Sequence, residues 1–299
     1  MEPRTDHPAP SVEALILTFD APEALGRCLG AVTACDPAPR SMIVVDNASR
    51  EPVDELVAAA PGARVVRLPE NTGPAGGYAA GFEAFLAGDA DWVWVLDDDC
   101  EPARDALALQ LADAAKGADL VMATMHDADT GALTNTQGWC AVLISRDVVE
   151  KVGVPDRDLF WWTEDTEYLQ WRIPRAGFTV ARSPEAIVEV TRGRASTEKP
   201  AWKYYYEARN QVYYRMTTQG AATERPLPRH LRLRVRAWRA WRSVGKLTVR
   251  AVVREHRHRL RKLRYIARGT ADGLRGRLGV TVTVDDSHRP GSTTGAAGA

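Results

Sequence analysis

Short apolar runs and amphipathic stretches alternate along the first third of the chain. The runs that predict buried strands are Val12–Phe19, Ser41–Val45, Arg64–Leu68 and Trp92–Leu96. The stretches whose spacing predicts helices are Ala21–Ala34, Val53–Ala60 and Tyr78–Ala87. Strands that alternate with helices in this way indicate a mostly parallel sheet with right-handed crossovers. The predicted fold class is therefore α/β.

Polar side chains follow three of these strands directly. The clusters are Thr18-Phe19-Asp20, Asp46-Asn47 and Asp97-Asp98-Asp99. Open parallel sheets bind ligands at the carboxyl ends of their strands, so we expect a site there. Three adjacent carboxylates repel one another by roughly 1 kcal/mol per pair in water. The third cluster therefore favours a bound Mg²⁺ or Mn²⁺, which takes carboxylate and phosphate oxygens. The alternative is a solvated acidic turn.

A glycine-containing loop, Asn71–Gly77, precedes the predicted helix at Tyr78. It is neither GxGxxG nor GxxxxGK[ST], and it follows the third strand, which disfavours a dinucleotide or Walker-type site. Its glycines either permit a tight turn into the helix or offer backbone N–H groups to an anion.

Length and composition limit the classes of protein to which this chain can belong. The chain has 299 residues, 45% hydrophobic and 26% charged, enough for one large domain and an appendage. No apolar run approaches the roughly 20 residues of a membrane span. Residues 1–11 are polar and proline-rich, which predicts a flexible N-terminus and no signal peptide. The four cysteines lack zinc spacing, which favours reduced thiols and a cytoplasmic protein.

A formal net charge of zero hides a strong asymmetry. Residues 1–224 carry 20 basic and 35 acidic side chains, whereas residues 225–299 carry 19 basic and 4 acidic ones. The boundary coincides with Arg225–Pro228, where two prolines end the preceding helix. We therefore expect a main domain at 12–224, a basic helical region at 225–285 and a disordered tail at 286–299.

The basic region predicts an amphipathic helix over Arg229–Arg268. Its apolar residues recur every three or four positions: Leu231, Val235, Trp238, Trp241, Val244, Leu247 and Val252. Two interpretations remain open. The helix either docks on the acidic domain or contacts anionic lipid at the inner face of the cell membrane. Nucleic acid is disfavoured, because no DNA-binding or base-stacking module accompanies the charge.

The order of motifs resembles a known family. The segments that carry the resemblance are Leu15–Asp20, Ile43–Ser49, Asn71–Gly77, Trp94–Asp99, Trp162–Glu167 and Tyr206–Asn210. Together they resemble inverting glycosyltransferases of family 2 with the GT-A fold, in the rhamnosyl- and galactofuranosyl-transferase branch. The resemblance covers residues 12 to about 215. It implies a nucleotide-sugar half at about 12–100 and an acceptor half at about 101–224.

The resemblance also implies roles for individual residues. Asp97 and Asp99 match the DxD motif that holds Mg²⁺ or Mn²⁺ against the donor diphosphate, and the Asp46 carboxylate would accept the pyrimidine N3–H. The residues implied in donor binding are Thr18, Phe19, Asp20, Asp46, Asn47, Asn71, Gly76, Gly77, Asp97 and Asp98. The family's usual asparagine is replaced by Asp20.

The implied catalytic base is Asp165, with Glu164 and Glu167 in support. Alternatively, these acids simply open a helix, where they favour its N-terminal dipole. The implied acceptor platforms are Trp139, Trp161 and Trp162. The branch often has a histidine metal ligand further along. This chain has Glu189 in that segment, as a substitute ligand or as a strand residue.

The implied reaction is the transfer of a sugar from a UDP- or dTDP-sugar to a hydroxyl acceptor with inversion. Such a displacement needs a base for the acceptor proton and a cation for the leaving diphosphate. The acceptor is a glycan, a lipid-linked glycan or a small molecule, and self-association stays open. Three other classes also stay open: a non-catalytic nucleotide-sugar or glycan-binding protein, a sugar-nucleotide pyrophosphorylase-like nucleotidyltransferase, and a membrane scaffold.

Overall fold

The computed structural model describes residues 10–135, 138–191, 199–217, 228–255 and 257–282. The chain divides into two compact units. Unit 1 comprises Met1–Arg157 and Tyr168–Arg192, and unit 2 comprises Asp158–Glu167 and Gly193–Ala299. Most of the predicted flexible N-terminus and the whole predicted disordered tail lie outside the described residues.

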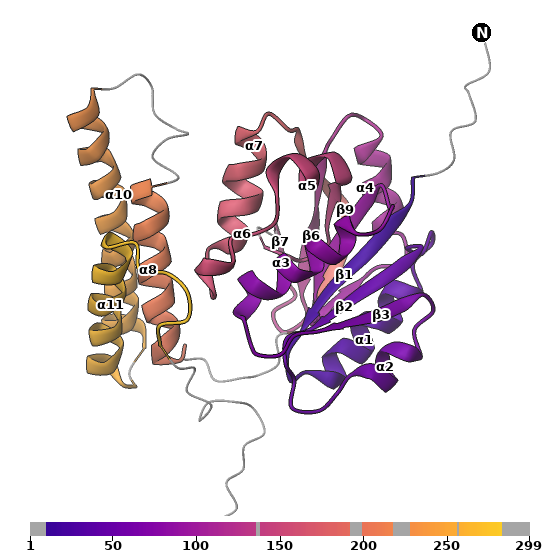
Figure 1. Cartoon of the computed structure of the whole chain (residues 1–299), viewed down its shortest axis with the longest axis horizontal. Helices are drawn as coiled ribbons and strands as arrows, with labels where there is room; N and C mark the ends of the chain where they lie inside the picture. Colours follow the sequence, from indigo (N-terminus) through magenta and orange to yellow (C-terminus); the bar gives the residue numbers. More distant parts are fainter. Residues whose placement is uncertain (1–9, 136–137, 192–198, 218–227, 256, 283–299) are drawn as a thin grey trace, which may run out of the picture. The chain divides into compact units, whose positions relative to one another are not determined.

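Unit 1 is built on a nine-stranded sheet in its described residues (Figure 1). Its strands are β1 (Val12–Thr18), β2 (Ser41–Asp46), β3 (Ala63–Arg67), β4 (Trp92–Asp97), β5 (Cys100–Pro102), β6 (Leu120–Asp127), β7 (Leu133–Asn135), β8 (Val142–Ser145) and β9 (Val180–Val190). The order is β3-β2-β1-β4-β8-β6-β9-β5, with β7 beside β6. The four strands predicted from the sequence are mutually parallel at one side of this sheet. The α/β prediction is confirmed.

Helices cover both faces of the sheet in unit 1. One face carries α1 (Pro22–Thr33), α2 (Asp54–Ala58) and α4 (Ala106–Ala114). The other carries α3 (Gly73–Leu86), α5 (Arg146–Val152), the π-helix η2 (Tyr168–Arg172) and α7 (Ile173–Arg175). Side chains of one strand alternate between the two cores, as the period of a strand requires. In β1, Ala14 and Ile16 enter the first core, and Leu15 and Leu17 enter the second.

The glycines before Tyr78 lie inside a helix, and the expected loop there is wrong. Helix α3 begins at Gly73, which has a φ of +68°. A Cβ at Gly77 would lie 2.4 Å from a methyl of Leu17, and one at Gly76 would lie 2.4 Å from the Thr72 side chain. Gly77 therefore lets α3 pack directly on β1, and Gly76 leaves room for the Thr72 side chain at the start of the helix. Their low helix propensity is outweighed by this close packing.

Unit 2 is helical in its described residues. Its elements are α6 (Glu164–Glu167), α8 (Ala201–Thr217), α10 (Arg229–Val249), the π-helix η3 (Arg250–Arg254) and α11 (Arg259–Leu274). The short helix η1 (Arg157–Leu159) lies at the division between the units. The single helix expected over Arg229–Arg268 is interrupted, because Glu255 is extended and His258 has a left-handed φ of +56°.

The tail helices pack on α8 through part of the predicted stripe. Val244 and Leu247 are buried with Tyr204, Ala208 and Val212 of α8. Trp238 and Trp241, in contrast, are 59% and 64% exposed. The docked interpretation therefore holds for one side of α10 and not for the two tryptophans. Within the described residues, no helix is both long enough and apolar enough to span a membrane.

Two glycines bring α11 against α8. A Cβ at Gly269 would lie 2.3 Å from the carbonyl oxygen of Tyr205, and one at Gly273 would lie 2.4 Å from that of Arg209.

We expect Gly269→Ala to lower the free energy of unfolding by about 1–3 kcal/mol, the usual cost of overpacking. Urea denaturation followed by circular dichroism measures the change. Gly245→Ala is the matched control, because a Cβ there meets nothing within 4 Å. It should stabilise α10 by up to about 1 kcal/mol. Equal effects of the two substitutions would contradict the packing argument.

Candidate active site

The three acidic residues lie at the carboxyl end of β4, as predicted. Asp97 is the last residue of β4, and Asp98 and Asp99 form the turn into β5. The hydroxyl of Tyr78, on α3, donates to Asp97 Oδ1. Thr18 Oγ1, at the end of β1, donates to Asp98 Oδ2 at 2.7 Å. The structure thus brings the ends of β1 and β4 together through side-chain hydrogen bonds.

Burial governs the ionisation of Asp98. It raises the pKa of this carboxyl to about 6, although hydrogen bonds from Thr18 and from the backbone of Phe19 act in the opposite direction. The neighbouring charge of Asp99 raises the pKa further. A cation at this turn would favour the ionised form, because an opposite charge stabilises a carboxylate.

Asp46, at the end of β2, is buried and holds the loop that follows it. Its Oδ1 accepts the backbone N–H of Ser49 at 2.8 Å, and its Oδ2 lies 2.5 Å from Nη1 of Arg67. Arg67 also donates to the carbonyl oxygen of Ser49 at 2.7 Å. Both oxygens thus have partners within the protein. A contact of Asp46 with a pyrimidine base stays a prediction that would use the remaining lone pairs.

Asn47 joins the loop after β2 to the start of α3. Its Nδ2 donates to Asn71 Oδ1 and to the carbonyl oxygen of Gly73, at 3.3 and 3.2 Å. Its Oδ1 accepts the backbone N–H of Thr72 at 2.9 Å. Asn47 and Asn71, both predicted donor-binding residues, therefore lie together. The buried Gly76 and Gly77 serve helix packing in this structure.

A hollow of about 270 Å³ lies beside the ends of β1 and β2. Its lining includes Asp20, Ser49 and Arg50. Asp20 has a left-handed φ of +52°, and its carboxylate accepts the backbone N–H of Arg50 at 2.8 Å and lies 3.2 Å from the Arg50 guanidinium. Asp20 therefore positions an arginine at this hollow.

Glu189 lies in β9, in agreement with its interpretation as a strand residue. It is opposite Glu101 of β5, and His126 Nδ1 lies 3.3 Å from its carboxylate. His126 is not among the residues predicted from the sequence. It is distant from Glu189 in sequence and lies level with it because β6 pairs in parallel with β9. Among the described residues, no group of three or more His, Cys, Asp or Glu side chains is arranged to hold a metal ion. A metal role for Glu189 stays a prediction.

The predicted acceptor platform at Trp139 is a core residue in this structure. The side chain is 3% exposed and packs against Tyr78, Phe82 and Tyr168. An acceptor sugar has no access to a ring buried in this way. Its packing against Tyr78 instead supports the tyrosine that bonds Asp97.

The predicted base and the other two tryptophans lie in unit 2. Asp165 and Glu164 open α6, so the helix-start interpretation of these acids is structurally correct and compatible with a catalytic role. Burial raises the pKa of Asp165, while hydrogen bonds from Thr166 act in the opposite direction. Trp162 is 44% exposed, and Trp161 packs edge-on against Trp202 of α8.

The backbone before Asp165 is strained and anchored. Phe160, Trp162 and Thr163 have φ values of +58°, +72° and +84°, each in the region that favours glycine. Such residues cost about 1–3 kcal/mol each and persist where their surroundings hold them, often at functional sites. Here Asn210 Nδ2 donates to the carbonyl oxygens of Leu159, Trp161 and Trp162 at 2.8, 2.8 and 2.6 Å.

Arg209 completes this anchor. Its Nη2 donates to the carbonyl oxygens of Asp158 and Leu159, at 3.2 and 2.9 Å. Its Nε donates to Asn210 Oδ1 at 2.8 Å, which fixes the orientation of the Asn210 amide. The segment Tyr206–Asn210 is one of the motifs that carry the family resemblance, and the sequence alone predicts no role for it. The structure gives it one, as the support of the segment that precedes Asp165.

We expect Asn210→Asp to damage this support more than its size suggests, because it replaces an N–H donor by an oxygen facing three carbonyl oxygens. Each carbonyl left unsatisfied costs about 1–3 kcal/mol. Thermal melting should show a lower midpoint, and turnover should fall while nucleotide affinity is kept. Asn135→Asp, at an exposed position of β7 far from this segment in sequence, is the charge-matched control. Wild-type turnover in Asn210→Asp would contradict the anchoring role.

Comparison with known proteins identifies the family. Residues 14–177 match the model of glycosyl transferase family 2. The chain belongs to this family. The family 2 match spans β2 to β8, the acidic turn and Asp165, so the glycosyltransferase prediction is confirmed at this level.

Individual relatives agree with this family 2 assignment. Galactofuranosyltransferase GlfT1 of Mycobacterium tuberculosis H37Rv is 44% identical over 102 residues, and its counterpart in Mycolicibacterium smegmatis is 41% identical over 91 residues. The first match covers 33% of this chain and 33% of the relative, and the second covers 30% of each. The match therefore spans about a third of the length of these curated relatives.

Solved structures agree in fold. S. aureus TarS 1–349 superposes with a TM-score of 0.58 at 11% identity, covering 89% of this chain and 82% of that one. Mannosyltransferase PcManGT from Pyrobaculum calidifontis, in complex with GDP-Man and Mn²⁺, gives a TM-score of 0.56 at 16% identity, covering 89% and 87%. The sheet and flanking helices are accordingly of the GT-A type, as the sequence motifs predict.

Proposed function

We propose that this protein transfers a sugar from a UDP- or dTDP-sugar to a hydroxyl acceptor, with inversion and with a divalent metal ion. The observation that carries the proposal is the acidic turn Asp97–Asp99 at the end of β4, fixed by Tyr78 and Thr18 within a family 2 fold. The similarity to galactofuranosyltransferases makes a nucleotide-linked galactofuranose the first donor to test.

The donor would lie at the ends of β1, β2 and β4. Polar groups gather there from Thr18, Asp46, Asn47 and Asp98. The hollow lined by Asp20, Ser49 and Arg50 adds a guanidinium beside these strand ends. Ligands of open parallel sheets bind at this edge, and arginine suits phosphate recognition.

The residues at the turn fit a hard divalent metal ion. Asp97 and Asp99 offer carboxylate oxygens, which Mg²⁺ and Mn²⁺ prefer, and Tyr78 orients the first of them. A site with few protein ligands is normal for Mg²⁺, which keeps waters and takes substrate phosphate. When bound, the ion would neutralise charge on the leaving diphosphate. We expect the Asp98 carboxylate to keep its hydrogen bond to Thr18, at the ends of β1 and β4, when the metal ion is bound.

Asp165 would act as the base. Its carboxylate would accept the proton of the acceptor hydroxyl as that oxygen attacks the anomeric carbon from the face opposite the diphosphate. Glu164 and Glu167 lie within the same turn of α6 and would support it electrostatically. The exposed ring of Trp162 would offer an apolar face to the acceptor sugar.

The proposal predicts how rate depends on pH. A base works in its deprotonated form, and burial raises the pKa of Asp165 above the ordinary value for aspartate of about 4. Turnover should therefore fall as the pH is lowered through this raised pKa, at a pH where exposed carboxylates are still ionised. A pH profile of kcat at saturating donor measures the midpoint. A flat profile between pH 5 and pH 8 combined with full activity at about pH 4 would contradict this role.

The decisive experiment separates a transferase from a binding protein. Candidate UDP- and dTDP-sugars are incubated with the protein and Mn²⁺, with and without hydroxyl acceptors, and release of the nucleoside diphosphate is followed. A transferase releases UDP or dTDP slowly by donor hydrolysis and faster with an acceptor. A non-catalytic binding protein releases neither. Formation of a nucleoside triphosphate and a sugar 1-phosphate from the donor when pyrophosphate is added would indicate a nucleotidyltransferase instead.

A further inference from the structure

The side of α10 that faces away from α8 carries large apolar side chains. Together with Val252 of η3 they are Trp238, Trp241 and Val249, separated by steps of three, eight and three residues. Eight residues make little more than two turns of a helix, so the four side chains share one side. All four are more than a third exposed. The stretch Arg229–Arg254 holds seven of the 13 exposed large hydrophobic residues among the described residues. Such a concentration marks an interaction surface.

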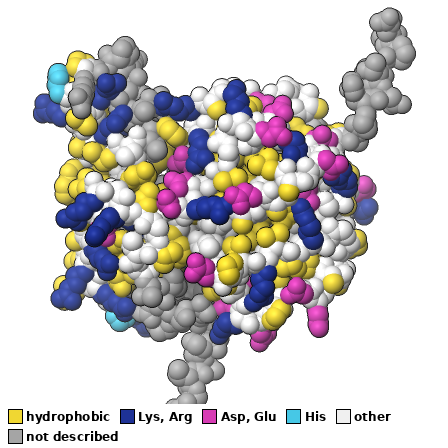
Figure 2. All heavy atoms as spheres, viewed as in Figure 1, with side chains coloured by type: hydrophobic (Ala, Val, Ile, Leu, Met, Phe, Trp, Pro, Cys, Tyr) yellow, Lys and Arg dark blue, Asp and Glu magenta, His cyan; other side chains and the backbone are white. Residues whose placement is uncertain are grey.

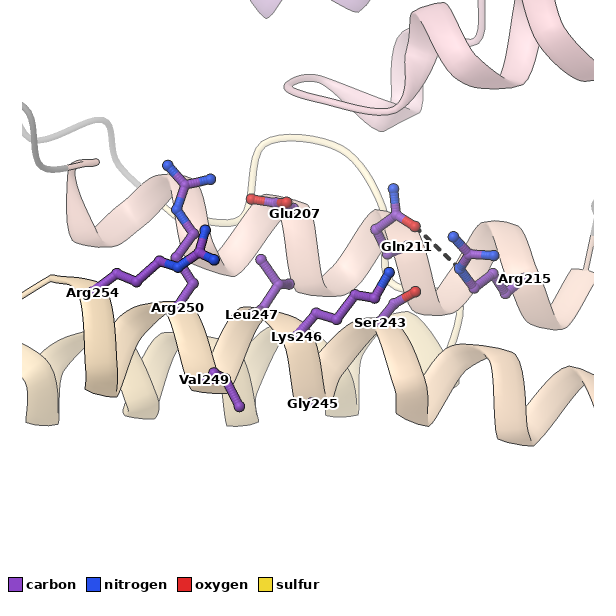
Figure 3. A pocket seen from close by; sticks show the side chains of 10 residues that line it. All are labelled: Glu207, Gln211, Arg215, Ser243, Gly245, Lys246, Leu247, Val249, Arg250 and Arg254. Atoms are coloured by element: carbon purple, nitrogen blue, oxygen red, sulfur yellow. Dashed lines mark hydrogen bonds between the residues drawn. The ribbon is translucent and has the colours of Figure 1, made fainter.

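A basic stripe runs beside this apolar one. Arg242, Lys246, Arg250 and Arg254 recur at steps of four residues, and all are exposed. Figure 3 shows Lys246, Arg250 and Arg254 directed toward α8, whereas Val249 points to the opposite side of α10. Between the two helices lies a groove of about 750 Å³, to which α8 contributes Arg215. The acidic residue of its lining, Glu207, is paired with Lys199.

The sequence of this region contains few acidic residues. Residues 229–282 contain 17 Lys and Arg but two acidic residues, Glu255 and Asp272. Both acids are buried. Glu255 lies 2.7 Å from Lys262 Nζ and 3.1 Å from Arg250 Nε, and Asp272 accepts the Tyr205 hydroxyl at 2.8 Å. Figure 2 shows Lys, Arg and hydrophobic side chains interleaved over the part of the surface that α10 and α11 form.

We propose that this face of α10 and η3 binds the surface of an anionic phospholipid bilayer. Trp238, Trp241 and Val249 would enter the boundary between head groups and acyl chains, where tryptophan is favoured. Arg242, whose guanidinium lies 5.4 Å from the centre of the Trp238 ring, would contact lipid phosphates directly. The rest of the basic stripe would add longer-range attraction to the anionic surface. A basic helix with tryptophan on its apolar side is typical of helices that lie in the plane of the membrane interface.

Charge and shape favour lipid over two other occupants. A second copy of this chain would present the same positive face, and like charges across an interface are repulsive. Nucleic acid would complement the positive charge of the basic stripe, but it would leave the exposed valine and tryptophan side chains without apolar partners. An anionic bilayer satisfies both stripes at once, because it offers phosphate and hydrocarbon within a short depth.

Vesicle sedimentation tests the proposal without any nucleotide sugar, so its outcome is independent of the proposed activity. The full chain is mixed with vesicles of phosphatidylcholine alone or with 30 mol % phosphatidylglycerol, a composition of about physiological charge. We expect binding to the anionic vesicles that weakens as salt is added, since screening weakens surface electrostatics. Arg242→Gln with Lys246→Gln, the two stripe residues nearest the tryptophans in sequence, should lower the partition coefficient about 25-fold, at about fivefold per basic residue. Arg104→Gln with Lys116→Gln, two exposed residues of unit 1, is the matched control and should bind normally.

Insertion is tested with brominated lipids, which quench tryptophan at the interface. Quenching should occur in the wild type and fall in Trp238→Phe with Trp241→Phe, a variant that keeps the apolar stripe and sediments with vesicles. Equal binding to neutral and anionic vesicles, or wild-type quenching in the double variant, would overturn the proposal. Self-association of the wild type in light scattering that disappears in Trp238→Ser with Trp241→Ser would also overturn it. A higher affinity of the protein for duplex DNA than for anionic vesicles would do the same. Circular dichroism establishes that each variant is folded.

Discussion

Replacing Asp165 by asparagine should lower kcat by about 10²–10⁴, the usual contribution of a positioned general base. The substitution keeps the size of the side chain and an oxygen that can accept the Thr166 N–H, which the Asp165 carboxylate accepts in the structure. We therefore expect a folded protein that binds its donor normally and turns it over slowly. Steady-state kinetics with saturating donor, together with calorimetric titration of UDP or dTDP, separates the two effects.

Glu164→Gln is the matched control for this prediction. It removes a carboxylate one position away in the same turn of α6 and should cost less. If Glu164→Gln abolishes turnover and Asp165→Asn is mild, the base is assigned to the wrong neighbour. If both variants bind UDP or dTDP weakly, the loss of activity reflects structure and not proton transfer.

Asp99→Asn should remove the metal dependence of nucleotide binding while leaving the fold intact. Asp99 lies in the turn between β4 and β5, where its carboxylate would be a ligand of the metal ion. Mutation of residues that only orient metal ligands lowers metal affinity by about 10–100-fold. We therefore expect the loss of a ligand itself to lower metal affinity at least tenfold. Calorimetric titration of UDP or dTDP with Mn²⁺, and again with chelator, measures it.

The control for this variant is Asp129→Asn, an exposed acid in the turn between β6 and β7. It changes the net charge equally and should leave nucleotide affinity and its chelator sensitivity unchanged. Nucleotide binding by the wild type that chelator does not affect would contradict the metal site altogether.

The strands and their chemistry were predictable because both depend on local patterns. Continuous apolar runs identified β1 to β4 to within one or two residues, and polar clusters at their ends identified the site edge. Parallel pairing then places Thr18 level with Asp46 and Leu17 level with Asp97. This part of the site follows from strand direction alone.

Other features depend on contacts between residues far apart in sequence. Gly76 and Gly77 signal a turn by composition, yet they lie in α3. Leu17 of β1 leaves no room for a side chain at Gly77, and Thr72 leaves none at Gly76. Trp139 has the composition of a sugar platform, but its neighbours Tyr78 and Tyr168 enclose it. The meeting of His126 with Glu189 requires the β6–β9 pairing, which leaves no local signal. Propensity and periodicity are local properties of the sequence, so they do not predict long-range packing of this kind.

Unit 2 is discontinuous in sequence, since it combines residues 158–167 with the helices after residue 199. The hydrogen bonds of Arg209 and Asn210 cross that gap in sequence, and Arg209 in turn is held by the carbonyl oxygen of Gly279. This dictates how hybrid enzymes should be assembled from relatives. A single crossover after residue 177, where the family match ends, would pair one parent's strained segment with the other parent's helices. A hybrid that exchanges residues 158–167 together with 199–282 keeps each anchor with the backbone it evolved to hold.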